Sequence, residues 1–160
     1  MEINKLKRKI RIILLVFIVL LVLSGVTAFP IETELEILND NSSIFPEFMR
    51  VWLNKVYLAV KDTNTKYPFL SYGTDWLAFA HLVIAVAFIG PLKDPVRNIW
   101  VIEFGIIACL MVIPLALIAG AVRGIPFYWR LIDCSFGILG LIPLIWCRRL
   151  IKQIETTSVS

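Results

Sequence analysis

The sequence is poor in the residues that build most catalytic and metal centres. It contains one histidine and three cysteines in 160 residues. Cys109, Cys134 and Cys147 lack the spacing of a zinc or redox motif, and no cofactor fingerprint is present. We therefore predict no catalytic residues, no metal and no cofactor, and we favour a non-enzymatic protein over an enzyme.

Apolar residues, in contrast, are abundant. They make up 59% of the chain, and the mean hydropathy is +0.82. A soluble domain has an apolar content of about 45 to 50%. The net charge of +4 arises from basic residues that cluster beside apolar stretches, as the positive-inside rule explains without a polyanion. The composition therefore predicts an integral membrane protein and argues against nucleic-acid binding.

Four apolar stretches dominate the chain, at residues 12–29, 76–92, 98–120 and 126–146. Each is long enough, at roughly 1.5 Å per helical residue, to cross a hydrocarbon core of about 30 Å. The predicted fold is all-α: a polytopic membrane protein in which four transmembrane helices form a bundle. We treat residues 1–160 as a single integral membrane domain.

The positions of Lys and Arg predict the orientation of these helices. Basic residues precede the first helix, lie between the second and third, and follow the fourth; they are Lys5, Lys7, Arg8, Lys9, Arg11, Lys93, Arg97, Arg148, Arg149 and Lys152. With four crossings, these three segments fall on one side. Both termini are therefore predicted to be cytoplasmic, and the membrane is expected to be the inner cell membrane.

The first apolar stretch has two interpretations. A basic start, an apolar run from Ile12 to Leu23 and small residues at Val26 and Ala28 also fit a signal peptide cleaved after Ala28. The run continues through Phe29 to nearly spanning length, which favours an uncleaved anchor. The orientation of the other three helices is the same in both cases.

The long outer connection, residues 30–74, contains one predicted helix at about 45–61. Its apolar residues recur at three- and four-residue spacing and define one face, represented by Phe45, Phe48, Trp52 and Val56. We expect an amphipathic helix that lies in the outer membrane interface or covers the bundle, in preference to a dedicated partner-binding helix. An irregular loop over 61–73 then leads to the second span.

Six ionisable residues lie in or near the apolar stretches and are predicted to be buried: Asp75, His81, Glu103, Arg123, Arg130 and Asp133. A charge at mid-bilayer costs about 2.5 to 3.5 kcal/mol or more, so such residues are usually paired or functional. We expect Asp75 to cap the second helix, whereas Arg123 and Arg130 can extend to water at the outer boundary.

His81 and Glu103 are predicted to lie at similar depth, about 13 Å and 7 Å from the cytoplasmic ends of adjacent helices. A hydrogen bond between them would hold the helices together, and proton transfer is the alternative role. On the fourth helix, Asp133 lies three residues after Arg130 and is predicted to pair with it or with Arg123. Together with Asp75 these groups form either a salt-bridge network or an outward pocket for an anion or a lipid headgroup.

Small residues predict where the helices approach closely. The third helix presents Gly105, Cys109, Val112 and Ala116, and the fourth presents Gly137 and Gly140. We therefore expect a structural or accessory component that packs with itself, as a homo-oligomer, or with another membrane protein. The alternative is a small proton-coupled transporter or channel-like protein that uses Glu103 and His81. A membrane enzyme acting on lipid at the outward polar cluster is the third hypothesis.

Overall fold

The computed structural model describes the backbone of residues 2–159, and within that range it is helical with no strand. The chain forms two compact units. The first comprises the residues up to Val19 together with those from Val86 onward, and the second comprises Leu20–Ala85.

Four helical segments of the described chain are long and apolar enough to cross a membrane: Ile3–Ala28, Pro68–Lys93, Ile99–Val122 and Phe127–Thr157. The prediction of four such helices is confirmed. Their ends differ, because α1 (Glu2–Ala28) begins before residue 12 and α8 (Phe127–Val159) continues past residue 146. Hydropathy falls where Lys, Arg and Glu begin, but these residues are good helix formers and the helices continue through them.

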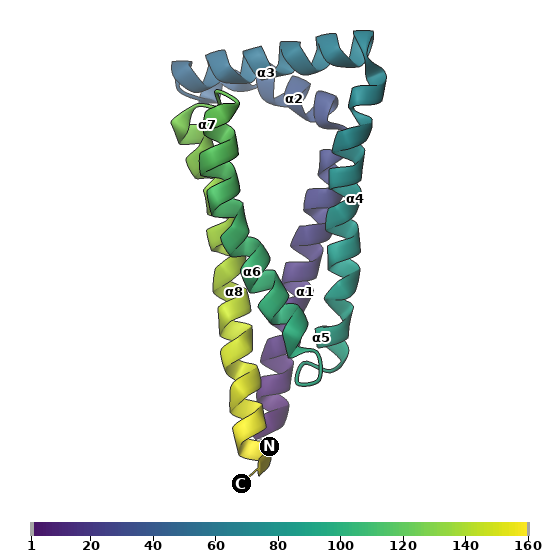
Figure 1. The fold of residues 1–160 in the computed structure, drawn as a ribbon, viewed down its shortest axis with the longest axis vertical. Helices are drawn as coiled ribbons and strands as arrows, with labels where there is room; N and C mark the ends of the chain where they lie inside the picture. The colour runs from purple at the N-terminus through teal and green to yellow at the C-terminus, as the bar shows by residue number, and fades with distance from the viewer. Residues whose placement is uncertain (1, 160) are drawn as a thin grey trace. The chain divides into compact units, whose positions relative to one another are not determined.

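In the first unit, α6 (Ile99–Pro114) and α8 lie side by side and run in opposite directions (Figure 1). Between them the chain forms η3 (Leu115–Ala119), a π-helical turn, and α7 (Gly120–Val122). A short helix, α5 (Ile89–Lys93), precedes α6. Ile102 of α6, Leu144 of α8 and Phe88 before α5 are fully buried, and they form the centre of this unit.

Glycines hold α6 and α8 at close range. A methyl group at Gly137 would lie 2.6 Å from the carbonyl oxygen of Cys109, and one at Gly140 would lie 2.9 Å from the Cys109 sulfur. A methyl group at Gly105 would lie 2.9 Å from Leu144 Cδ1. The predicted contact between the small residues of these two helices is confirmed.

The first half of α1 belongs to the same unit. Its Ile10 and Leu14 are fully buried, and the Phe17 ring lies 4.8 Å from the Phe88 ring, measured between centroids. Phe17 also lies against the Gly140 position of α8. The last part of α8 buries a matching set of apolar residues: Cys147, Leu150, Ile151 and Ile154.

In the second unit, the last part of α1 packs against α4 (Tyr72–Ala87). The contact is made at Gly25, where a methyl group would lie 2.8 Å from the carbonyl oxygen of Ala78. Ala78 and Ala85 are buried, and His81 lies beside Gly25 on the same face. His81 therefore faces a neighbouring helix, as its place among small residues predicts.

The outer connection contains two helices instead of one. The first, α2 (Ile31–Asp40), was not predicted, and η1 (Ser42–Ile44) follows it. The second, α3 (Glu47–Lys66), replaces the predicted helix 45–61, and only η2 (Pro68–Leu70) separates it from α4. The predicted irregular loop over 61–73 is therefore wrong for most of its length, because α3 continues to Lys66, η2 follows and α4 begins at Tyr72. Figure 1 shows α2 and α3 together, lying across the end of α4.

The buried side of α3 overlaps the predicted apolar face only in part, because Leu53 belongs to both and Tyr57 only to the observed side. Leu53 and Tyr57 are its buried residues, whereas Phe48 is 56% exposed. Phe45, Trp52 and Val56, the other members of the predicted face, are half-buried. The reason is α2, because packing against this second helix selects the side of α3 that carries Leu53 and Tyr57.

Candidate functional site

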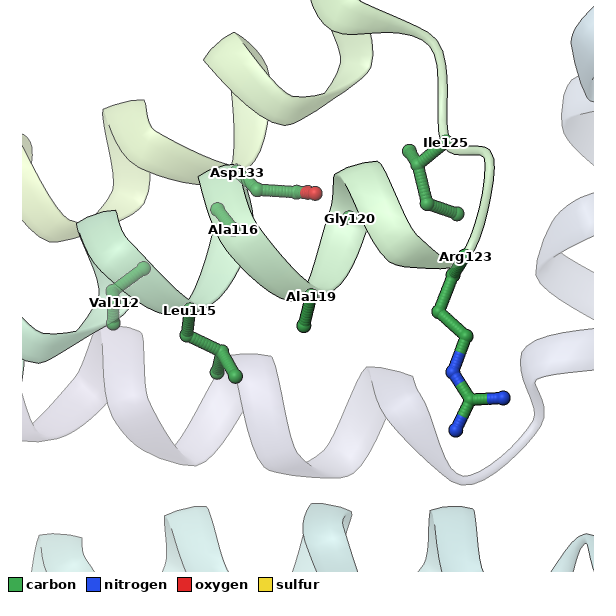
Figure 2. Close-up of a pocket in the computed structure, with 8 residues that line it drawn as sticks. All are labelled: Val112, Leu115, Ala116, Ala119, Gly120, Arg123, Ile125 and Asp133. Atoms are coloured by element: carbon green, nitrogen blue, oxygen red, sulfur yellow. The ribbon is translucent and has the colours of Figure 1, made fainter.

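A pocket of about 290 Å³ lies where α6 continues into the turn before α8 (Figure 2). Its walls are mainly aliphatic, and it contains one acidic and one basic residue. The lining residues are Val112, Leu115, Ala116, Ala119, Gly120, Arg123, Ile125 and Asp133. All of them belong to the first unit. We refer to this site as the Asp133 pocket.

The local sequence explains why the backbone widens here. Pro114 has no N–H group to continue the α-helical hydrogen bonds, and the π-helical turn Leu115–Ala119 follows it directly. Such turns are frequent at functional sites. Gly124, with a φ of 68°, then reverses the chain, so that the Ile125 N–H can donate to the Gly120 carbonyl oxygen at 2.9 Å. Alanine and glycine in this segment leave the space that forms the pocket.

Arg130 is bound to the backbone of this turn. Its Nη1 donates to the Leu117 carbonyl oxygen at 3.3 Å, and its guanidinium carbon lies 5.3 Å from the centroid of the Phe127 ring. The side chain crosses Gly120, where a methyl group would lie 2.6 Å from Arg130 Cδ. Its Nε is buried without a hydrogen-bond partner in the described part of the chain. The predicted pairing of Arg130 with Asp133 is therefore wrong, because a carbonyl at the widened turn binds the guanidinium instead.

Asp133 has no hydrogen-bond or ion-pair partner among the described side chains. Figure 2 shows its carboxylate directed along the pocket near Gly120, while the Arg123 side chain extends away from it. The predicted pairing of Asp133 with Arg123 is also not formed. The Asp133 carboxylate can thus accept hydrogen bonds from a cation or a hydroxyl group that enters the pocket.

Glu103 forms an ion pair that the sequence did not predict. Arg148 Nε donates to Glu103 Oε1 at 2.9 Å and links α8 to α6, with both side chains slightly less than half exposed. The Nδ1 atom of His81, in the second unit, lies 2.9 Å from the Leu77 carbonyl oxygen. The pairing of His81 with Glu103 stays a prediction, and Arg148 is the partner that Glu103 has in this structure.

The six candidate residues differ in how far the rest of the chain covers them. Arg123 is exposed, and the other five are half-buried. Asp75 also differs in its role, because α4 begins at Tyr72 and places Asp75 in the first turn of the helix rather than before it. Its N–H donates to the Ser71 carbonyl oxygen at 3.0 Å. A carboxylate in the first turn still interacts favourably with the positive end of the helix dipole.

A chain of polar contacts joins α2 to α3 in the second unit. The Tyr57 hydroxyl donates to Glu36 Oε1 at 2.9 Å, and Lys61 Nζ donates to the Tyr57 oxygen at 2.8 Å. The hydrogen bond between Lys61 and Tyr57, together with the nearby Glu36 and Glu32 carboxylates, raises the pKa of Lys61 above its ordinary value of 10.5.

A second pair of contacts extends this chain. Asn64 Nδ2 donates to Glu32 Oε2 at 2.6 Å, and the Ser71 hydroxyl donates to Asn64 Oδ1. The sequence carries a signal for these contacts, because Glu32 and Glu36 are four residues apart and Tyr57, Lys61 and Asn64 follow helical spacing.

Within the described residues, no three His, Cys, Asp or Glu side chains lie close enough together to hold a metal ion. Comparisons with protein-family models, with curated proteins and with solved structures find no match for this chain.

Proposed function

We propose that this chain is an integral membrane protein with four membrane-spanning helices that acts as a structural or accessory component, packed with itself or with another membrane protein. The observation that carries the proposal is the close contact of α6 and α8 through Gly105, Gly137 and Gly140. In lipid, helices associate by van der Waals packing at small residues rather than by the hydrophobic effect. A pair of helices packed in this way suits a protein whose role is structural.

The outer surface of α8 supports the same proposal. Opposite its contact with α6, this helix exposes a stripe of large apolar side chains: Phe136, Leu139, Ile142 and Trp146. Lipid tails or the helix of a partner would cover such a stripe, whereas water would not. In a membrane, the stripe is available for a second copy or another membrane protein.

We propose further that α2 and α3 lie along the outer membrane interface as an amphipathic pair. The support is that α3 lies across the end of α4, and α4 belongs to a segment long enough to span the membrane. A helix across the end of a spanning helix follows the membrane plane. Ile44, Phe48, Val51 and Leu58 add exposed apolar side chains to this part of the chain, as interfacial helices have.

For the orientation we propose that both termini are cytoplasmic and that residues 30–74 are outside, on the basis of the Lys and Arg distribution. Single cysteines near Ser158 and near Asn41 can be labelled in intact cells with a reagent that does not cross membranes. We expect labelling at the position near Asn41 and none near Ser158 until the cells are opened. Labelling near Ser158 in intact cells would reverse the orientation.

The structural role is tested against proton-coupled transport with the wild type and the Glu103→Gln variant. Glu103 is held by Arg148, and a paired carboxylate at a helix contact favours a structural role. We expect no pH-driven flux in proteoliposomes for either protein. After mild solubilisation of native membranes, we expect a particle heavier than the 18.2 kDa chain.

Glu155→Gln serves as the matched control, because Glu155 is also an ion-paired glutamate, bonded to Lys152 on α8. Flux in the wild type that is lost in Glu103→Gln, with an unchanged melting temperature, and kept in Glu155→Gln would replace the structural role with transport. A particle of single-chain mass under every mild condition would also count against the proposal.

A further inference from the structure

One end of the first unit carries a dense group of cations. They lie on the first turns of α1 and on the last turns of α8, and they are Lys5, Lys7, Arg8, Lys9, Arg11, Arg148, Arg149 and Lys152. All eight are exposed. We call this group the basic end. Figure 1 shows the start of α1 and the end of α8 next to each other in this part of the unit.

The burial of apolar residues on both helices explains why the cations point outward. Ile10 and Leu14 of α1 are fully buried, and Ile151 and Ile154 of α8 are 0% and 4% exposed. The apolar side of each helix is thus covered, and the Lys and Arg residues between these positions occupy the remaining sides. Because α1 and α8 continue without a break from the apolar segments, the proposed membrane location places the basic end directly beside the membrane surface.

The two described carboxylates near this end, Glu103 and Glu155, are already paired. Glu103 is bonded to Arg148 at 2.9 Å, and Glu155 is bonded to Lys152 at 2.8 Å. The other six cations of the basic end have no ion-pair partner among the described side chains: Lys5, Lys7, Arg8, Lys9, Arg11 and Arg149. Cations held together in this way repel one another unless anions approach them.

We propose that the basic end binds the headgroups of anionic phospholipids in the adjacent membrane leaflet. Each Lys or Arg near an anionic surface contributes about 1 kcal/mol of attraction, and clusters of four to eight such residues beside a spanning helix are typical of this interaction. Arg groups can also bind a lipid phosphate through two hydrogen bonds at once. This inference rests on the proposed membrane location and adds a lipid partner to it.

The test uses the full chain in vesicles of phosphatidylcholine that contain a small fraction of spin-labelled phosphatidylglycerol or, for comparison, spin-labelled phosphatidylcholine. We expect the wild type to associate with the anionic lipid about threefold or more strongly than with the neutral one. In 1 M salt the preference should fall toward one, because the screening length shortens to about 3 Å. A preference that is absent at low salt, or unchanged by salt, overturns the proposal.

Three variants show which cations produce the preference for the anionic lipid. Replacing Lys5, Lys7, Arg8, Lys9 and Arg11 with Gln should remove most of the preference, whereas replacing Arg50, Lys55, Lys61 and Lys66 of α3 should leave it unchanged. A third variant, with Lys5, Lys7 and Lys9 replaced by Arg, keeps the charge and should keep the preference. An equal loss in the α1 and α3 variants would overturn the assignment to the basic end.

Insertion of each protein is checked first, by its resistance to extraction with alkaline carbonate. A wild type that is extracted contradicts the proposed membrane location itself. A wild type that stays in the membrane but shows no preference for the anionic lipid contradicts only this inference. Because the salt titration needs no substitution, it decides the matter even if an α1 variant inserts poorly.

Discussion

Replacing Gly137 with alanine is expected to destabilise the protein by about 1 to 3 kcal/mol, the usual cost of overpacking a close contact. The new methyl group would lie 2.6 Å from the carbonyl oxygen of Cys109 and 3.3 Å from Val112 Cβ. The nearest atom belongs to the backbone of α6, so no side-chain rotation can relieve the clash. The two helices must separate, and the contact that carries the proposed structural role is weakened with them.

Gly73→Ala is the matched control. Gly73 also lies in a helix, α4, but a methyl group there would have no atom within 4 Å. Since alanine is a better helix former than glycine by about 1 kcal/mol, this variant should be as stable as the wild type or slightly more stable. Thermal melting of both variants in one detergent provides the measurement. If Gly137→Ala melts at or above the wild-type temperature, the close packing of α6 and α8 does not contribute to stability.

Replacing Leu53 with aspartate should unfold the α2–α3 pair. Leu53 is 3% exposed, so an aspartate at this position would hold an ionised carboxylate away from water. Burying such a charge costs several kcal/mol, more than a pair of short helices can lose while staying folded. The polar contacts of Tyr57 with Glu36 and Lys61 would be lost in the same event, because they depend on the two helices lying together.

Asn54→Asp introduces the same carboxylate one residue later, where the side chain is exposed, and should have little effect. Limited proteolysis and hydrogen exchange over residues 31–66 distinguish the two variants. We expect rapid cleavage and exchange in Leu53→Asp and near wild-type protection in Asn54→Asp. Equal protection in the two variants would show that the buried side of α3 does not hold this segment.

The sequence predicted the helices at their centres better than at their ends. Hydropathy locates the apolar part of a span, but α1 begins at Glu2 and α8 continues to Val159 because helix propensity does not stop where charge begins. This difference also affected the site. A fourth helix that ends at residue 146 leaves Arg148 in the cytoplasmic flank, whereas α8 continues past it and brings Arg148 to Glu103.

The outer connection, residues 30–74, shows a different limit of prediction from sequence. Ile31, Leu35 and Leu38 have helical spacing that could have revealed α2, but the four acidic residues of this stretch resemble a solvated loop. Without α2 as a known packing partner, the spacing of the apolar residues of α3 fits more than one buried face. The spacing therefore places Phe48 on the buried face and leaves out Tyr57. In the structure Tyr57 is buried, and its hydroxyl donates to Glu36.

The sequence by itself determined the number of apolar helices, their approximate positions and the small residues at which α6 and α8 meet. These properties follow from composition and from spacing along one chain segment, which need no knowledge of neighbouring segments. Only the tertiary structure decided the partners of the ionisable groups: Arg148 for Glu103, the Leu117 carbonyl for Arg130, and none for Asp133 among the described side chains. A polar side chain binds the nearest suitable group in space, and that group is set by helix ends and turns that hydropathy does not record.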